Sequence, residues 1–116
     1  MKLAIALLAL LMASEAHAET GIASYYGHHE HYAKYTACGE VFRPLGITAA
    51  HRTLPCGTLV RVTDTSTGNY VDVTVTDRGP FIRGRIIDLS YGAAIRLGIV
   101  ARGTAHVRVQ KLWERP

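Results

Sequence analysis

The fold is decided by residues 70–81, which read YVDVTVTDRGPF. The first seven residues alternate between polar and apolar side chains, so three valines share one face, as in a half-buried β-strand. Asp77 follows on the same parity as the valines, and the Gly-Pro pair two residues later ends the strand. The pattern predicts a mostly β protein in which a carboxylate, in phase with buried residues, stands where a strand stops.

Asp77 is therefore a candidate general acid. Burial beside apolar side chains disfavours the charged form of a carboxyl group and raises its pKa, and a raised pKa in a cleft suits proton donation. The alternative is an aspartate that caps its own turn beside Gly-Pro. The strand pattern alone leaves both interpretations open.

Short strands separated by turns dominate the rest of the chain. Turn residues occupy positions 64–69, and each alternating or apolar run is short, which favours a small β-barrel or sandwich. We expect further strands at residues 21–26, 59–63, 85–87 and 104–112.

One short helix is expected after Ser90. Serine is a good N-cap, the residues that follow include strong helix formers, and Gly98 is a natural terminator. A helix this short does not persist alone, so Ile95 or Leu97 must pack onto the barrel. Asp88 precedes the helix N-terminus, where the helix dipole favours a negative charge.

Residues 1–18 have the pattern of a secretory signal peptide, with an early lysine, an apolar run and an Ala-His-Ala cleavage site. The apolar run is too short to cross a membrane and no cysteine follows it, so we expect neither membrane insertion nor a lipid anchor. The protein is then exported, to the periplasm or the medium. Of the 116 residues, positions 19–116 remain, and these 98 residues suffice for one domain.

The two cysteines, Cys38 and Cys56, both lie in the exported part. In an oxidising compartment an even pair indicates a disulfide, which would contribute about 3 kcal/mol to stability. Two buried free thiols are the alternative.

The charge pattern argues against nucleic acid as a partner. The formal net charge is +4, carried by scattered arginines with no dense basic tract. A diffuse positive field suits an anionic polymer outside the cytoplasm, and it suits solubility equally well.

Two further residues could share acid/base work with Asp77. Glu40 lies beside a glycine next to Cys38, and His51 lies between an alanine pair and a loop that ends in proline. An aspartate, a glutamate and a histidine suffice for general acid/base catalysis, but the sequence does not show that they converge.

Tyrosines near the start of the domain are candidates for sugar binding. Tyr25, Tyr26 and Tyr32 could stack on sugar rings and bond them through their hydroxyls, or they could be packing residues of an edge strand.

A histidine cluster at residues 28–31 raises the question of a metal. His28, His29 and His31 surround Glu30, but the spacing is not that of a helical His-Glu-x-x-His site, and the flanking residues indicate a loop. We expect a surface histidine loop, with no metal and no cofactor.

Five ordered segments resemble the rare lipoprotein A family of bacterial septal and cell-wall proteins. The resemblance covers residues 21–110 and implies a six-stranded double-psi β-barrel with one short helix, the fold of expansins and barwin-like proteins. The matching segments are residues 23–27, 36–42, 48–55, 77–81 and 84–90.

The resemblance implies an endolytic peptidoglycan lytic transglycosylase. Such an enzyme cleaves the bond between N-acetylmuramic acid and N-acetylglucosamine in glycan strands that lack stem peptides, and it leaves 1,6-anhydro ends. The implied partner is the glycan strand, and we expect a monomer. The resemblance also implies the site residues. The catalytic residues would be Asp77, Glu40 and His51, and the substrate-binding residues would be Tyr25, Tyr26, Arg78 and Asp88.

Two other functions fit the same cleft. The first is a non-catalytic, expansin-like module that binds the cell wall. The second is a β-glycan hydrolase, which needs a second carboxylate to activate water, and Asp88 or Glu40 are the candidates.

Overall fold

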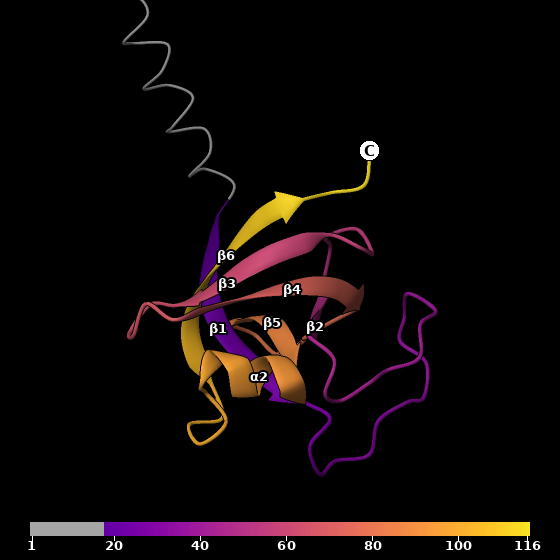
Figure 1. The fold of residues 1–116 in the computed structure, drawn as a ribbon, viewed down its shortest axis with the longest axis horizontal. Coiled ribbons are helices and arrows are strands. Elements are labelled where there is room, and N and C mark those ends of the chain that lie inside the picture. The colour runs from indigo at the N-terminus through magenta and orange to yellow at the C-terminus, as the bar shows by residue number, and fades with distance from the viewer. Residues whose placement is uncertain (1–17) are drawn as a thin grey trace, which may run out of the picture.

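The computed structural model describes residues 18–116, so the predicted signal peptide lies outside the described residues apart from Ala18. Within this range the chain forms six strands and one helix (Figure 1). In chain order they are β1 (Glu19–Tyr26), β2 (Thr48–His51), β3 (Leu59–Asp64), β4 (Tyr70–Asp77), β5 (Arg85–Ser90), α2 (Tyr91–Leu97) and β6 (Ala105–Trp113).

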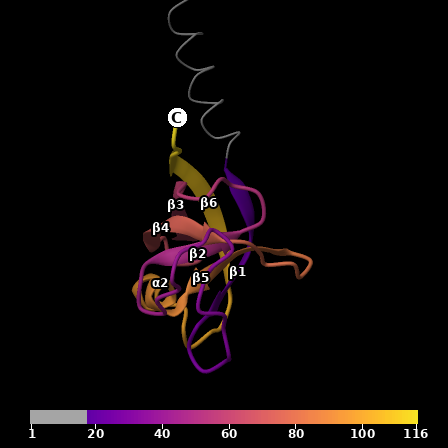
Figure 2. The same ribbon diagram turned by 90° about the vertical axis from the view of Figure 1, so that its right-hand side faces the viewer.

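The strands close into a barrel in the order β1-β5-β2-β4-β3-β6. The pairs β1–β5 and β2–β4 are parallel, and the remaining pairs are antiparallel. Figure 2 shows the barrel from the side on which the long loop between β1 and β2 lies. The expected mostly β fold with one short helix is confirmed.

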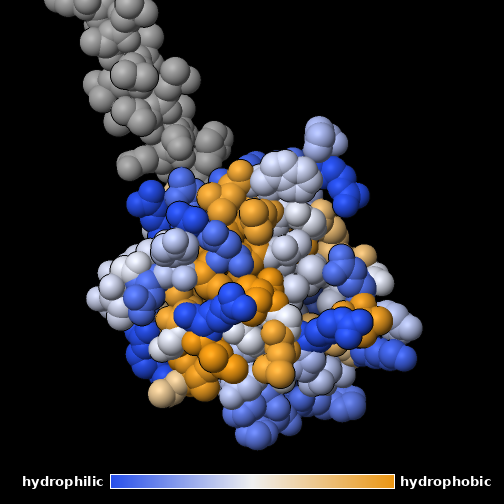
Figure 3. Space-filling view, in the orientation of Figure 1, coloured by the Kyte–Doolittle hydropathy of each residue, from blue (hydrophilic) through white to orange (hydrophobic). Residues whose placement is uncertain are grey.

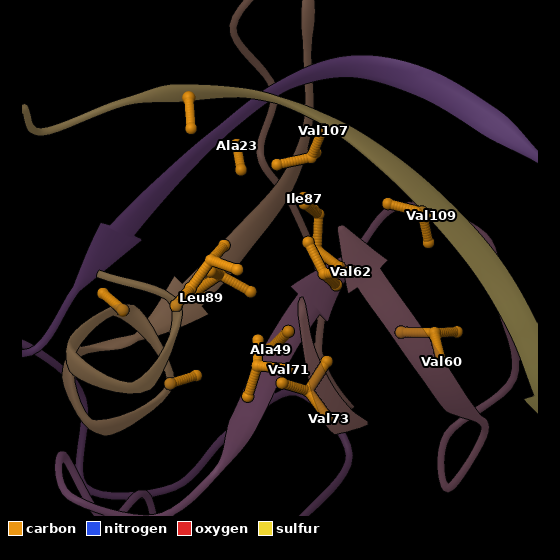
Figure 4. Close-up of a cluster of buried hydrophobic side chains, with 14 of the residues drawn as sticks. Ala23, Ala49, Val60, Val62, Val71, Val73, Ile87, Leu89, Val107 and Val109 are labelled. Carbon is orange, nitrogen blue, oxygen red and sulfur yellow. The ribbon is translucent and has the colours of Figure 1, made fainter. Parts of the chain in front are cut away.

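The core fills the inside of this barrel, where side chains from all six strands meet (Figure 4). The alternation expected in the valine strand and in residues 104–112 is confirmed from Val71 to Val75 and from Ala105 to Val109, where every second residue is buried. Each buried valine or leucine side chain contributes about 1.5–3 kcal/mol. The strand residues at the centre of the core are Ala23, Ala49, Val60, Val62, Val71, Val73, Val75, Ile87, Leu89, Val107 and Val109.

Helix α2 begins and ends as expected. The Ser90 hydroxyl accepts a hydrogen bond from the backbone N–H of Ala93 at 3.1 Å, and Gly98 ends the helix in the left-handed conformation at φ 83°. Leu97 packs into the core, whereas Ile95 is 49% exposed. Apolar residues are visible over α2 in Figure 3. In the part of the chain that the structure covers, no helix has both the length and the hydropathy to cross a membrane.

The expected disulfide between Cys38 and Cys56 is present. It joins the β1–β2 loop to the loop between β2 and β3. The Cys38 backbone N–H also donates to the carbonyl of Thr76 at 3.3 Å, so the disulfide lies beside the end of β4.

Strand β2 was not expected as a strand. Its four residues, Thr-Ala-Ala-His, precede the loop that ends in proline, and they pair with β4 on one side and β5 on the other. Without β2 the barrel would not close, and the residues described next would not meet.

Candidate active site

Four side chains form a row across the outer face of the barrel. Ser24 of β1 is opposite Asp88 of β5, and Asp88 is also opposite Ala50 of β2. Ala50 is in turn opposite Asp77 of β4. The strand neighbour of Ala50, Ala49, points into the core, so the row faces outward. We call these four residues the carboxylate row.

The two acids of the row are two strands apart. Neighbouring strands lie about 4.8 Å apart, so roughly 10 Å separates the Cα atoms of Asp77 and Asp88. Ala50, of which 3% is exposed, lies between them in the strand pairing.

Asp77 reaches the outer face because of a bulge. The register between β2 and β4 shifts by one residue, so that Ala49 is opposite Val75 but Ala50 is opposite Asp77. Thr76 is the extra residue and is buried. The parity argument, which placed Asp77 in phase with the buried valines, is therefore wrong.

Three donors from three segments hold the Asp77 carboxylate. Its Oδ1 atom accepts hydrogen bonds from the backbone N–H groups of Ala37 and Arg78, each at 2.9 Å. Its Oδ2 atom accepts one from the Tyr26 hydroxyl at 3.2 Å. Charge-assisted bonds of this kind fix the direction of a carboxylate.

An aromatic cluster aims the Tyr26 hydroxyl at Asp77. The Tyr26 and Phe42 rings stack with centroids 4.7 Å apart, and Tyr32 meets Phe42 edge-on at 4.9 Å. Gly27 makes this contact possible, because its φ is 90° and a Cβ there would lie 2.8 Å from the Phe42 ring. Burial, followed by the nearby charge of Asp77, raises the pKa of the Tyr26 hydroxyl, which therefore remains a donor.

Asp88 is a second carboxyl group with an unusual environment. Burial raises its pKa to about 6, the hydrogen bond from Ser24 opposes that shift, and the charges of Glu30 and Asp77 add to it. Asp88 lies two residues before Ser90, the N-cap of α2, and so outside the first turn of the helix, and it faces the carboxylate row.

The shifted pKa of Asp88 predicts how its removal changes stability with pH. Because the folded pKa exceeds the ordinary value of 3.8, the folded state favours the protonated form. The resulting stability is complete below pH 4 and is lost as the pH rises through about 6. Asp88→Asn should therefore raise the free energy of unfolding by roughly 1–3 kcal/mol at pH 8 and change it little at pH 3.5.

Thermal melts of the parent and variant at both pH values measure this difference. Asp72→Asn is the matched control, because a hydrogen bond from Arg61 lowers the pKa of Asp72. That variant should lose stability at pH 8 and less of it at pH 3.5, the opposite sign to Asp88→Asn. An Asp88→Asn protein that gains nothing at pH 8 would contradict the burial of this carboxyl.

His51 and Glu40 do not converge on Asp77 as side chains. His51 is opposite Ile87 of the core, so its imidazole lies on the other face of the sheet from the carboxylate row, where its Nε2 atom is 2.9 Å from Glu19. Glu40 lies in the turn that supplies Ala37, but its carboxylate is exposed and makes no hydrogen bond within residues 18–116.

Two of the residues assigned to substrate binding have other contacts. The Tyr25 hydroxyl donates to the carbonyl of Val100 at 2.9 Å, and its ring packs against the core. The Arg78 guanidinium donates to the carbonyls of His51 and Leu54, so it holds the loop after β2. The other two residues assigned to substrate binding, Tyr26 and Asp88, do lie at the site. Ser24, Phe42 and Ala50 lie in the matching segments 23–27, 36–42 and 48–55, but sequence reasoning assigned them no role at the site.

The histidine cluster forms a loop at the end of β1. The His28 ring stacks on Tyr91 with centroids 4.0 Å apart, and Glu30 accepts hydrogen bonds from the backbone of Gly27 and His29. Between residues 18 and 116, no three His, Cys, Asp or Glu side chains are grouped as a metal site would require.

A family model described as lytic transglycolase matches residues 18–109, which include the whole carboxylate row. The chain belongs to this family. Two members named as rare lipoprotein A proteins show how close the relationship is. A probable endolytic peptidoglycan transglycosylase RlpA from Nostoc sp. is 56% identical over 93 residues, which cover 79% of this chain and 25% of that protein. Its counterpart from Vibrio cholerae is 50% identical over 92 residues, which cover 79% of this chain and 35% of that protein. The chain thus spans about a quarter to a third of these relatives.

Comparison with solved structures shows that this chain has the double-psi β-barrel fold. Streptomyces papain inhibitor superposes with a TM-score of 0.66 and 26% identity, covering 83% of this chain and 94% of the inhibitor. An expansin from Clavibacter michiganensis superposes with a TM-score of 0.65 and 21% identity, covering 85% of this chain and 52% of the expansin. The double-psi fold expected from the sequence is confirmed.

Proposed function

We propose that this barrel is an endolytic lytic transglycosylase of peptidoglycan. It cleaves the bond between N-acetylmuramic acid and N-acetylglucosamine in strands that lack stem peptides and leaves 1,6-anhydro ends. The observation that carries the proposal is Asp77, an oriented carboxylate on the outer face of a barrel from the lytic transglycolase family. The relatives named as endolytic peptidoglycan transglycosylases support the same substrate.

In the proposed reaction one carboxyl group acts twice. Protonated Asp77 donates its proton to the glycosidic oxygen, and the bond from that oxygen to C1 of the muramic acid breaks with its electron pair on the oxygen. The resulting Asp77 carboxylate takes the proton of the C6 hydroxyl, and O6 bonds to C1 of the oxocarbenium-like centre. The ring closes without water.

The contacts of Asp77 support the carboxylate stages of this reaction. The two backbone N–H groups and the Tyr26 hydroxyl are all donors, so they stabilise the carboxylate that forms when the proton leaves. They also hold the carboxylate in place for the second step. Glu40 lies at the edge of the same turn, where it can contact the glycan from solvent.

A glycan suits the surroundings of Asp77. In the Tyr26–Phe42–Tyr32 cluster beside the carboxylate, Tyr32 is 39% exposed, and Phe81 is 79% exposed on the loop that follows Asp77. An expansin of this fold has been crystallised with cellohexaose, which fits a sugar polymer as ligand. The substrate lies outside the cytoplasm, so the proposal includes export, as residues 1–18 predict.

A hydrolase of β-linked glycans is the second candidate, and the carboxylate row favours it specifically. Asp88, whose pKa is raised to about 6, could act as the acid while Asp77 activates a water. Roughly 10 Å between the two Cα atoms is compatible with the wide carboxyl separation of inverting glycosidases.

The mass of the product decides between these candidates. The protein is incubated with sacculi whose stem peptides an amidase has removed, and the soluble fragments are analysed by mass spectrometry. Fragments with anhydro ends support the transglycosylase, and fragments heavier by one water support the hydrolase. Binding to the sacculi with no soluble product would leave the expansin-like module as the function.

A further inference from the structure

The buried imidazole of His51 takes part in a turn rather than in the carboxylate row. Its Nδ1 atom accepts hydrogen bonds from the backbone N–H groups of Thr53 at 3.2 Å and Leu54 at 3.1 Å. Its Nε2 atom contacts Glu19 at 2.9 Å, and the side chain is only 7% exposed. The pocket beside Nε2 is lined by Glu19 and Lys111 among others, and by no residue of the carboxylate row.

These contacts fix the tautomer of the ring. A backbone N–H can only donate, so Nδ1 must be the unprotonated nitrogen. The carboxylate of Glu19 can only accept, so Nε2 carries the hydrogen. A proton added at Nδ1 would meet two N–H groups and break both bonds. In the structure the ring therefore serves the turn as an acceptor at Nδ1.

The turn that His51 stabilises also binds the side chain of Arg78. One guanidinium nitrogen of Arg78 donates to the carbonyls of His51 at 3.0 Å and Leu54 at 2.5 Å. The backbone N–H of the same arginine donates to Asp77 at 2.9 Å. The imidazole, the turn and the guanidinium therefore form a continuous path that ends at the carboxylate.

We propose that His51 is a positioning residue that orients Asp77 through Arg78 and takes no part in proton transfer. The inference uses the proposed function for its activity readout. It also assigns Arg78 to positioning, in place of the substrate contact expected from the sequence.

Two conservative variants of His51 separate positioning from acid/base catalysis. In His51→Asn the amide oxygen takes the place of Nδ1, and an asparagine readily accepts the N–H groups two and three residues ahead. In His51→Gln the amide instead reaches toward Glu19 and leaves Thr53 and Leu54 without their acceptor. Neither variant has an imidazole.

If His51 positions Asp77, His51→Asn keeps most of the parent's kcat and the same pH–rate profile. His51→Gln and Arg78→Ala each lower kcat by about 100-fold with little change in KM, since a small misplacement of a catalytic group has this effect. The double variant His51→Gln, Arg78→Ala loses no more than the worse single one, because both changes break one path. Arg96→Ala, which removes the same charge from the exposed face of α2, is the control.

Two results would overturn the inference: a His51→Asn protein as inactive as His51→Gln, or one that loses a limb of the pH–rate profile. Single and double losses that multiply would do so as well. If His51→Gln fails to fold, the comparison of kcat between Arg78→Ala and His51→Asn still tests the inference, because only Arg78→Ala should lose activity.

Failure of the proposed function is recognisable separately. A parent protein that releases no product contradicts the transglycosylase, and the path is then judged by NMR. Hydrogen exchange at Thr53 and Leu54 should stay slow in His51→Asn and become fast in His51→Gln, and the Arg78 amide resonance should shift only in the latter. An Arg78 resonance unchanged in both would refute the path.

Discussion

Asp77→Asn is expected to lower the release of anhydro-ended fragments by about 10⁴-fold, since one side chain supplies both the acid and the base. The fold should remain intact. The asparagine oxygen can still accept from the N–H groups of Ala37 and Arg78, and the Tyr26 hydroxyl can turn to accept from the new amide.

The measurement is the initial rate of fragment release from amidase-treated sacculi, beside a melting curve for each protein. Asp88→Asn is the comparison, because it makes the same chemical change at the other acid of the carboxylate row. A transglycosylase that uses Asp77 alone keeps part of its activity in that variant, whereas a two-carboxylate hydrolase loses it in both. Full activity of Asp77→Asn would end the assignment of Asp77.

Replacing both cysteines by serine is expected to lower the free energy of unfolding by about 3 kcal/mol, since the disulfide closes a loop over a sequence separation of 18 residues. For a domain of this size the melting temperature should fall by roughly 10–20 °C. Activity should also fall below the melting transition, because the Cys38–Cys56 bond holds the turn whose Ala37 N–H binds Asp77.

Calorimetry of the oxidised parent, the reduced parent and the Cys38→Ser, Cys56→Ser variant tests this. Reduction should make the parent behave like the variant, and the same reductant should leave the variant unchanged. A variant that melts at the parent's temperature would show that the disulfide adds nothing.

Most of the framework could be predicted from local patterns. The valine strand and β6 alternate over enough residues to be recognised, and Ser90 and Gly98 are strong local signals for the ends of α2. Strand β2 has only four residues and two adjacent alanines, so no periodicity could reveal it. Its strand conformation comes from its two partners.

The site was harder to predict than the framework, for a physical reason. The residues around Asp77 identify it as a candidate, but the strand pattern predicts the wrong face of the sheet for its side chain. The bulge that turns it outward is visible only in the register with the partner strand. The resemblance groups His51 with Asp77 as a catalytic residue. It is Ala50, however, that lies opposite Asp77, and its neighbour His51 points to the other face of the sheet. Distances across a barrel depend on pairing, which a single sequence does not contain.

The carboxylate row takes one residue from each of four strands, and the chain visits those strands in a different order from their order in the sheet. Only a fragment that runs from β1 through β5 therefore contains the whole row. The last contributor, Asp88, arrives only when β5 is inserted between β1 and β2. The proposed glycan cleavage is thus expected to disappear together with global unfolding in a denaturant titration.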